Sequence, residues 1–167
     1  MVHPRTELRY YFELVLQKAK ADLRTEAARG YLGVLWWIIE PIMYMGAFYI
    51  VFAHLYRRGD DSFVMFLLTG LIAWKWFHST VSVGSNSLMV NVNLMNQVYL
   101  PKIVFPLTTI TVNTIKFLII LSLFLLFLQF GAEKASWDWI LLPGIIFVQL
   151  LLIVAVTSFF SAIAERK

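Results

Sequence analysis

The sequence contains no cysteine, and only 14% of its 167 residues are charged. Without cysteine the chain can form no disulfide framework, no thiolate metal site and no cysteine nucleophile. It also lacks a glycine-rich phosphate loop of the form G-x-x-x-x-G-K-[ST], so we expect no nucleotide hydrolysis by this chain. What it has in excess is apolar character, with 60% hydrophobic and 16% aromatic residues. That composition is far from an ordinary soluble domain and predicts a membrane protein.

Four apolar segments are long enough to cross a bilayer, which takes about 20 residues. They are residues 31–55, 63–83, 104–130 and 139–162. Each is expected to be a helix, because backbone groups in lipid must find their hydrogen-bond partners within the segment. The sequence therefore predicts an all-α, polytopic membrane protein with a transmembrane domain over residues 31–167 and a long loop at 84–103.

Residues 1–30 are expected to form a separate part of the molecule. Apolar residues recur there at spacings of three and four, with charges between them: Leu8, Tyr11, Phe12, Val15, Leu16, Ala19 and Leu23. This spacing predicts an amphipathic helix that lies in the cytoplasmic interface. The helix could serve only as an anchor that fixes topology, or it could receive force or substrate.

Lysine and arginine are unevenly distributed around the predicted spans. Nine of the twelve that lie outside the spans flank the two termini or lie in the loop 84–103, and three lie in the other loops. Short loops rich in these residues stay in the cytoplasm. Both termini and the loop 84–103 are therefore predicted to be cytoplasmic.

Glu40 is the only acidic residue inside a predicted span. A carboxylate at that depth is costly, so it is normally kept for a pathway, a partner or a gate. At about 100° per residue it shares a sector of about 80° with other residues of the first span: Gly33, Trp37, Tyr44 and Phe48. Aromatic rings offer faces for stacking and, in Trp and Tyr, a polar edge, which suits a sliding sugar chain. The alternative is that Trp36 and Trp37 are interfacial residues and the others pack helix against helix.

The third span carries a similar polar face, formed by Thr109, Asn113 and Lys116. Lys116 and Lys75 lie at about the depth of Glu40, given a rise of about 1.5 Å per residue. Glu40 could therefore pair with either lysine, which would lower the cost of both charges. Lys75, between two tryptophans, could instead extend toward the interface.

The loop 84–103 alternates apolar residues with asparagines and ends at Pro101 and Lys102. This pattern predicts a short amphipathic helix on the cytoplasmic surface that is stopped by proline. Such a helix could dock into a groove on a soluble partner.

Three segments together resemble the permease subunit of ABC-2 type polysaccharide exporters, which move O-antigen, capsule or teichoic-acid chains out of bacteria. They are YLGVLWWIIEP, TGLIAWKWF and NLMNQVYLPKIVFPL, in this order. The resemblance implies a homodimeric permease in the bacterial inner (plasma) membrane that exports a lipid-linked glycan. It also implies a cytoplasmic ABC ATPase subunit that binds ATP and magnesium, a coupling helix after the second span and a channel lined with aromatics. No nucleic acid is expected as a partner, and membrane lipids surround the chain.

Carried over by position, the resemblance makes 89–101 the segment that couples the ATPase to the spans. The residues expected to carry this contact are Met89, Leu94, Met95, Tyr99, Pro101 and Lys102. With the polar face of the third span, the candidate channel residues are Trp37, Glu40, Tyr44, Phe48, Asn113 and Lys116. No catalytic residue, metal site or cofactor of the chain's own is predicted.

The chain departs from the family in one respect. Family permeases have six spans with an outer gate between the last two, whereas this sequence predicts four. We expect this chain to be a fragment of such a protein. An ABC-2 exporter of a small lipid or drug remains an alternative, as do an intramembrane enzyme and a membrane scaffold. An enzyme is disfavoured because Glu40 has no second acid in the bilayer, and His54 and His78 lie near opposite surfaces.

Overall fold

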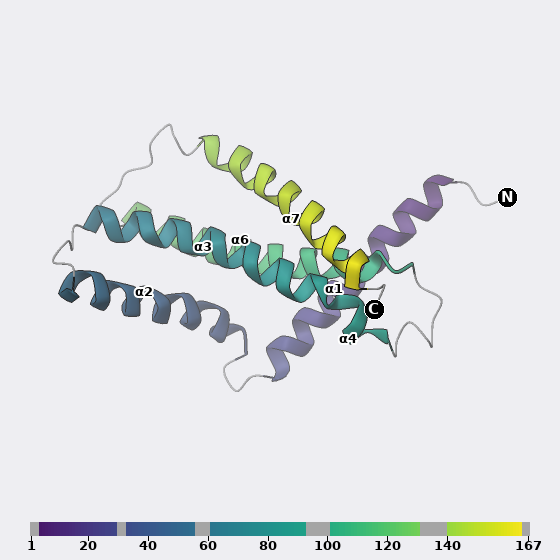
Figure 1. The fold of residues 1–167 in the computed structure, drawn as a ribbon, viewed down its shortest axis with the longest axis horizontal. Coiled ribbons are helices and arrows are strands. Elements are labelled where there is room, and N and C mark those ends of the chain that lie inside the picture. Colours follow the sequence, from purple (N-terminus) through teal and green to yellow (C-terminus); the bar gives the residue numbers. More distant parts are fainter. Residues whose placement is uncertain (1–3, 30–32, 56–60, 93–100, 131–139, 165–167) are drawn as a thin grey trace.

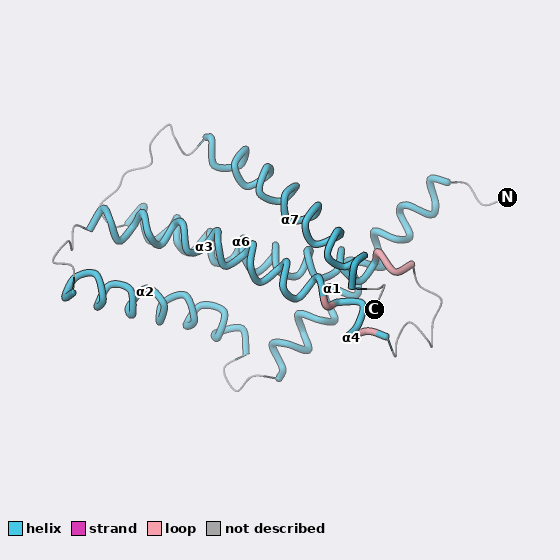
Figure 2. The backbone as a smooth tube through the Cα atoms, viewed as in Figure 1, coloured by secondary structure: helices cyan, strands magenta, loops and turns pink. Residues whose placement is uncertain are grey.

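The computed structural model describes residues 4–29, 33–55, 61–92, 101–130 and 140–164. Regular structure in these ranges is helical (Figure 2). The elements are α1 (Pro4–Arg29), the 3-10 turn η1 (Gly33–Leu35), α2 (Trp36–Leu55), α3 (Asp61–Ser85), α4 (Ser87–Val90), α6 (Val104–Phe130) and α7 (Leu142–Ala164). The predicted all-α class is confirmed for the described part of the chain.

The helices follow the four predicted segments with small differences at their ends. The first differs most, because η1 precedes α2 and the α-helix begins only at Trp36. Gly33 has a positive φ of 50°, and a Cβ there would lie 2.9 Å from the backbone oxygen of Ala27. Glycine at position 33 therefore allows the close approach of η1 to α1. Because Gly33 lies before the α-helix begins, the prediction that it shares a helical face with Trp37 and Glu40 is wrong.

Within the described residues, two helices are long and apolar enough to cross a membrane, over Val104–Leu126 and Leu142–Ile163. Only 22% and 17% of these windows are buried inside the protein. The core helix of a soluble protein would be mostly buried, so this exposure fits a lipid environment. The predicted count of four spans stays a prediction.

Helix α3 packs extensively against both α6 and α7 (Figure 1). The centre of this contact is a cluster of buried side chains, Trp76, Ile110, Phe117 and Ile153. The Trp76 and Phe117 rings are stacked, with centroids 4.1 Å apart and planes at 9°. Since lipid supplies little hydrophobic drive between helices, such close packing is what holds spans together.

Two further contacts fasten α7 to α3. Gly84 and Thr157 approach so closely that a Cβ at position 84 would overlap the Thr157 methyl group. Nearer the N-terminal end of α7, the Gln149 side-chain amide donates to the Ala73 carbonyl oxygen at 2.8 Å. A small residue at a helix crossing and an interhelical hydrogen bond are both typical of packing in membranes.

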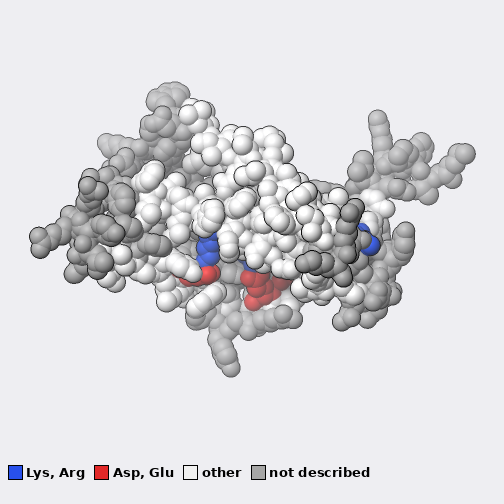
Figure 3. All heavy atoms as spheres, viewed as in Figure 1, with Lys and Arg blue, Asp and Glu red and all other residues white. Residues whose placement is uncertain are grey.

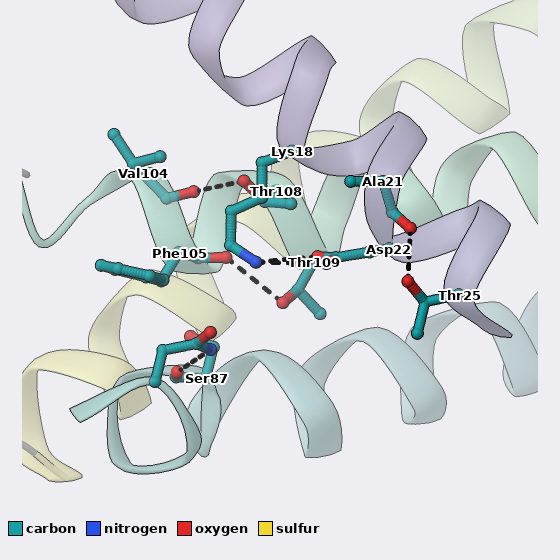
Figure 4. Close-up of polar contacts among 10 residues, drawn as sticks. Lys18, Ala21, Asp22, Thr25, Ser87, Val104, Phe105, Thr108 and Thr109 are labelled. Atoms are coloured by element: carbon teal, nitrogen blue, oxygen red, sulfur yellow. Dashed lines mark hydrogen bonds and ion pairs between the residues drawn. The ribbon is translucent and has the colours of Figure 1, made fainter. Parts of the chain in front are cut away.

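Helix α1 crosses the first turns of α6 (Figure 4). Val15 and Ala19 of α1 are buried, and the Lys18 ammonium lies 5.9 Å from the centre of the Phe105 ring. Phe12, which the sequence places on the same apolar face, is 64% exposed. The N-terminal helix is therefore present over Pro4–Arg29, while its position in the membrane interface stays a prediction.

The predicted coupling segment is described only in part. Helix α4 ends at Val90, and the described residues begin again at Pro101. The Pro101 carbonyl oxygen accepts a hydrogen bond from the Val104 amide at 3.0 Å. Met89 is 50% exposed and Lys102 is also exposed. The remaining residues of that prediction, Leu94, Met95 and Tyr99, lie outside the described residues.

The ends of the helices fall into two groups. Figure 1 shows α4 and the C-terminal end of α7 at one end of the molecule, with the C-terminal end of α2 and the N-terminal ends of α3 and α7 at the other. This arrangement is compatible with the predicted topology, in which the N-terminal helix, the loop 84–103 and the C-terminus share one side of the membrane. The orientation itself stays a prediction.

Candidate functional site

A cavity of about 530 Å³ lies between α2, α3 and α6, with one residue of α1 at its edge. Five of the six candidate channel residues line it: Trp37, Glu40, Tyr44, Asn113 and Lys116. The side chain of the sixth, Phe48, lies outside the described residues. The structure thus brings together residues of the first and third predicted spans that lie at least 69 positions apart in the sequence.

Glu40 pairs with Lys75 across this cavity. The Glu40 Oε1 atom of α2 lies 2.6 Å from the Lys75 Nζ atom of α3. Despite this distance the contact lacks the angles of a hydrogen bond, and the Lys75 nitrogen is shielded from the surroundings without a hydrogen-bond acceptor. The same nitrogen lies 4.9 Å from the centre of the Tyr44 ring. The sequence left two lysines open as partners of Glu40, and the structure selects Lys75.

Lys116 has a partner that the sequence did not predict. Its ammonium group donates to a carboxylate oxygen of Glu26, the α1 residue at the edge of the cavity. It also lies 5.2 Å from the centre of the Trp37 ring. Both lysines are therefore held in the same manner, by one carboxylate and by the face of one aromatic ring.

The two ion pairs have acids and lysines on the same sides of the cavity. Both acids lie on α1 and α2, and both lysines lie on α3 and α6. Pairing removes much of the cost of placing each charge in an apolar setting. In Figure 3 charged side chains of both signs gather at one place on this face, and most of the described surface around them is uncharged.

The remaining wall of the cavity is mainly apolar and aromatic. Leu68 and Phe117 contribute to it, and Ser79 is a small polar residue in the lining. Trp76 also lines the cavity, although only 4% of its surface is exposed. An apolar wall with a few polar groups is typical of a site for an organic ligand.

Glu26 and Trp76 are two of the lining residues that the sequence did not predict. Glu26 was assigned to a helix in the membrane interface, where a glutamate is expected to face water. Only the crossing of α1 over α6 brings it to Lys116. Trp76 was considered as a neighbour of a lysine that extends toward the interface, and its stacking on Phe117 shows that it faces the protein interior.

Comparison with known proteins gives a consistent result. The chain is 26% identical over 163 residues to the O-antigen export system permease protein RfbA of Myxococcus xanthus, which covers 98% of this chain and 63% of that protein. It is also 26% identical over 157 residues to the protein of the same name from Klebsiella pneumoniae, covering 93% of this chain and 61% of that protein. The chain resembles O-antigen export permeases.

The resemblance drawn from the three sequence segments is thereby confirmed, and together with the two apolar helices it indicates a membrane protein. No family model matches the sequence. The chain spans about three fifths of the length of these curated relatives. What the complete protein transports, and with which partners, is therefore a matter for proposal.

Proposed function

We propose that this chain is the permease part of an ATP-driven ABC exporter that moves a lipid-linked, O-antigen-like polysaccharide across the bacterial inner membrane. Two independent observations support the proposal. The similarity to O-antigen export permeases extends over nearly the whole chain, and five of the six residues predicted to line a channel line one cavity.

The cavity is the observation that carries the most weight. Trp37 and Tyr44 line it with aromatic rings, and Glu40 and Asn113 add polar groups at its wall. Aromatic faces beside carboxylate and amide groups suit sugar rings, which have both apolar faces and hydroxyl edges. An exporter of a small lipid would use the same rings only for packing, so the polar groups favour the glycan.

The working unit is a pair of permeases with two cytoplasmic ATPases. ATP and magnesium bind to the ATPase, because the chain has no phosphate-binding loop of its own. The segment 89–101, which contains the exposed Met89, docks into a groove of the ATPase and transmits its closure to the spans. In this arrangement both termini and the segment are cytoplasmic.

Replacing Leu94 and Tyr99 by Asp in the complete protein tests this function. Two charges on the apolar side of the docking segment should leave membrane insertion intact, release the ATPase during purification and stop the appearance of polysaccharide at the cell surface. The matched control is Asn91→Asp with Asn96→Asp, which adds the same charge at polar positions. If the Leu94/Tyr99 variant kept its ATPase and exported polymer at the normal rate, the proposed coupling would be wrong.

A further inference from the structure

We propose that the short helix α4 is a movable joint against the C-terminal end of α7, and that hydroxyl groups buried there gain hydrogen-bond partners when α4 shifts. The docking segment 89–101 begins within α4, so a pull on this segment is a pull on α4. The inference rests on the proposed function for the source of the motion. It adds the place where the motion enters the spans.

Helix α4 is held at one end and accessible at the other. It contacts α3, α6 and α7 (Figure 1), and its first two residues, Ser87 and Leu88, are only 4% and 6% exposed. Its last two residues, Met89 and Val90, are 50% and 79% exposed. The four residues of α4 make about one helical turn. A partner that displaces the exposed end therefore moves the buried end with it.

The buried hydroxyl groups fall into two classes. Among the described residues, five serine and threonine side chains are buried. Thr80 and Thr108 each donate to the backbone carbonyl oxygen four residues earlier in their helix. Ser87, Thr157 and Ser161 have no hydrogen-bond partner in the described part of the chain. A hydroxyl group that leaves water without gaining a partner costs free energy, and here this cost is concentrated on α4 and the end of α7.

Thr157 shows how a second arrangement satisfies such a group. Threonine in a helix has two common rotamers, because its hydroxyl can donate to the carbonyl oxygen three or four residues earlier. Thr157 is fully buried with its methyl group against Gly84, and its hydroxyl makes no such bond. The close contact with Gly84 holds this rotamer. When the contact loosens, the side chain can turn and donate to the Ile153 carbonyl oxygen.

Gly84 connects this contact to α4. It is buried near the end of α3, three residues before α4 begins. A Cβ at this position would lie 2.3 Å from the Thr157 methyl carbon and 3.8 Å from the Thr109 methyl carbon, so the approach depends on glycine. Because less than one helical turn separates Gly84 from Ser87, a shift of α4 acts directly on the contact between Gly84 and Thr157.

Replacing Thr157 in the complete protein separates a joint from a merely structural contact. Valine keeps the shape of threonine and removes a hydroxyl that has no partner here, so Thr157→Val should keep or raise thermal stability in detergent. The second arrangement loses its hydrogen bond, so export of polymer to the cell surface should fall about fivefold. Thr157→Ser keeps the hydroxyl and should export normally. Thr80→Val is the control, because it removes a hydroxyl that already donates; it should gain no stability and leave export per folded molecule unchanged.

A second set of variants tests the close approach itself. Gly84→Ala forces a methyl group against Thr157 and should lower both thermal stability and export. Gly84→Ala combined with Thr157→Ser removes the clashing methyl group and keeps the hydroxyl, so it should restore both. Gly70→Ala adds a methyl group to α3 where no other heavy atom lies within 4 Å, and it should change neither. Failure of the double variant to recover export would overturn the joint, even if Gly84→Ala alone does not fold.

The movement of α4 is measured with an environment-sensitive dye on Asn86→Cys, an exposed position directly before α4. In the complete protein with its ATPase, ATP and vanadate should change the dye emission, and Thr157→Val should abolish the change. A dye on Phe66→Cys, which is 77% exposed near the other end of α3, should not respond.

The outcomes separate this inference from the proposed function. If Thr157→Val exported normally, or lost stability together with export, the joint would be wrong and the proposed function would stand. An exporting protein without a dye response at position 86 would have the same meaning. A response that Thr157→Val abolishes, in a protein that exports no glycan, would support the joint and overturn the proposed substrate.

Discussion

Helices α3, α6 and α7 meet through buried apolar side chains, whereas α2 meets α3 and α6 across a cavity with charged residues in its wall. On the packed side, the Trp76 and Phe117 rings are in direct stacking contact and Ile153 is fully buried. On the other side, Glu40 reaches Lys75 with both side chains about one third exposed. Apolar packing fixes helices in one arrangement, while an ion pair can be broken and remade. We therefore expect movement at α2.

The largest expected effect is on the packed side. Trp76→Ala removes a ring from the contact of α3 with α6 and leaves a cavity, and large-to-small changes of this kind cost about 3 kcal/mol or more. We expect a marked loss of thermal stability in detergent, measured by fluorescence-detected size exclusion. Trp74→Ala is the matched control, because Trp74 is 61% exposed. Equal losses in the two variants would break the distinction between the packed and the open side.

The ion pair should contribute less to stability. Glu40→Gln leaves the shielded Lys75 ammonium without its carboxylate. Because both side chains are about one third exposed, the cost should lie between those of exposed and buried pairs, at about 1–2 kcal/mol. The same thermal assay should show a smaller shift than for Trp76→Ala. Glu13→Gln removes the acid of an exposed pair with Arg9 on α1 and serves as the control. A loss as large as that of Trp76→Ala would mean that charge, and not packing, holds this region together.

The smallest effect is expected at the hydrogen bond between α7 and α3. Gln149→Leu removes the donor to the Ala73 carbonyl oxygen, and interhelical hydrogen bonds in membranes contribute about 0.6 kcal/mol on average. The expected change in thermal stability is therefore close to the error of the assay. A loss larger than that of Glu40→Gln would show that α7 depends on this bond more than on its apolar contacts.

Much of the fold could be predicted from the sequence, because length and apolar composition are local properties. The helix Val104–Phe130 has the bounds that its apolar run predicts. The entry to α2 could not be predicted in the same way, because the positive φ of Gly33 depends on the approach of η1 to α1. A periodicity that continues through residue 33 carries no sign of that turn.

The residues of the candidate site could be predicted within each helix, but the contacts between helices could not. Helical periodicity placed Glu40 with Trp37 and Tyr44, and Asn113 with Lys116, because residues of one face follow from spacing. Which lysine pairs with Glu40 depends on how α2 lies against α3, and spacing within one helix does not contain that information. The pairing of Glu26 with Lys116 depends on the crossing of α1 over α6, which is also a tertiary property.

The most direct test of the account asks whether the cavity lies on the path of the exported glycan. Ser79 lines it and Ser82, one turn further along α3, is exposed outside it. Because this chain has no cysteine, Ser79→Cys and Ser82→Cys each place a single thiol in it. We expect a bulky methanethiosulfonate reagent to modify the cysteine at either position and to stop polysaccharide export only in the Ser79→Cys protein. Export that continues at the normal rate after complete modification at position 79 would contradict it.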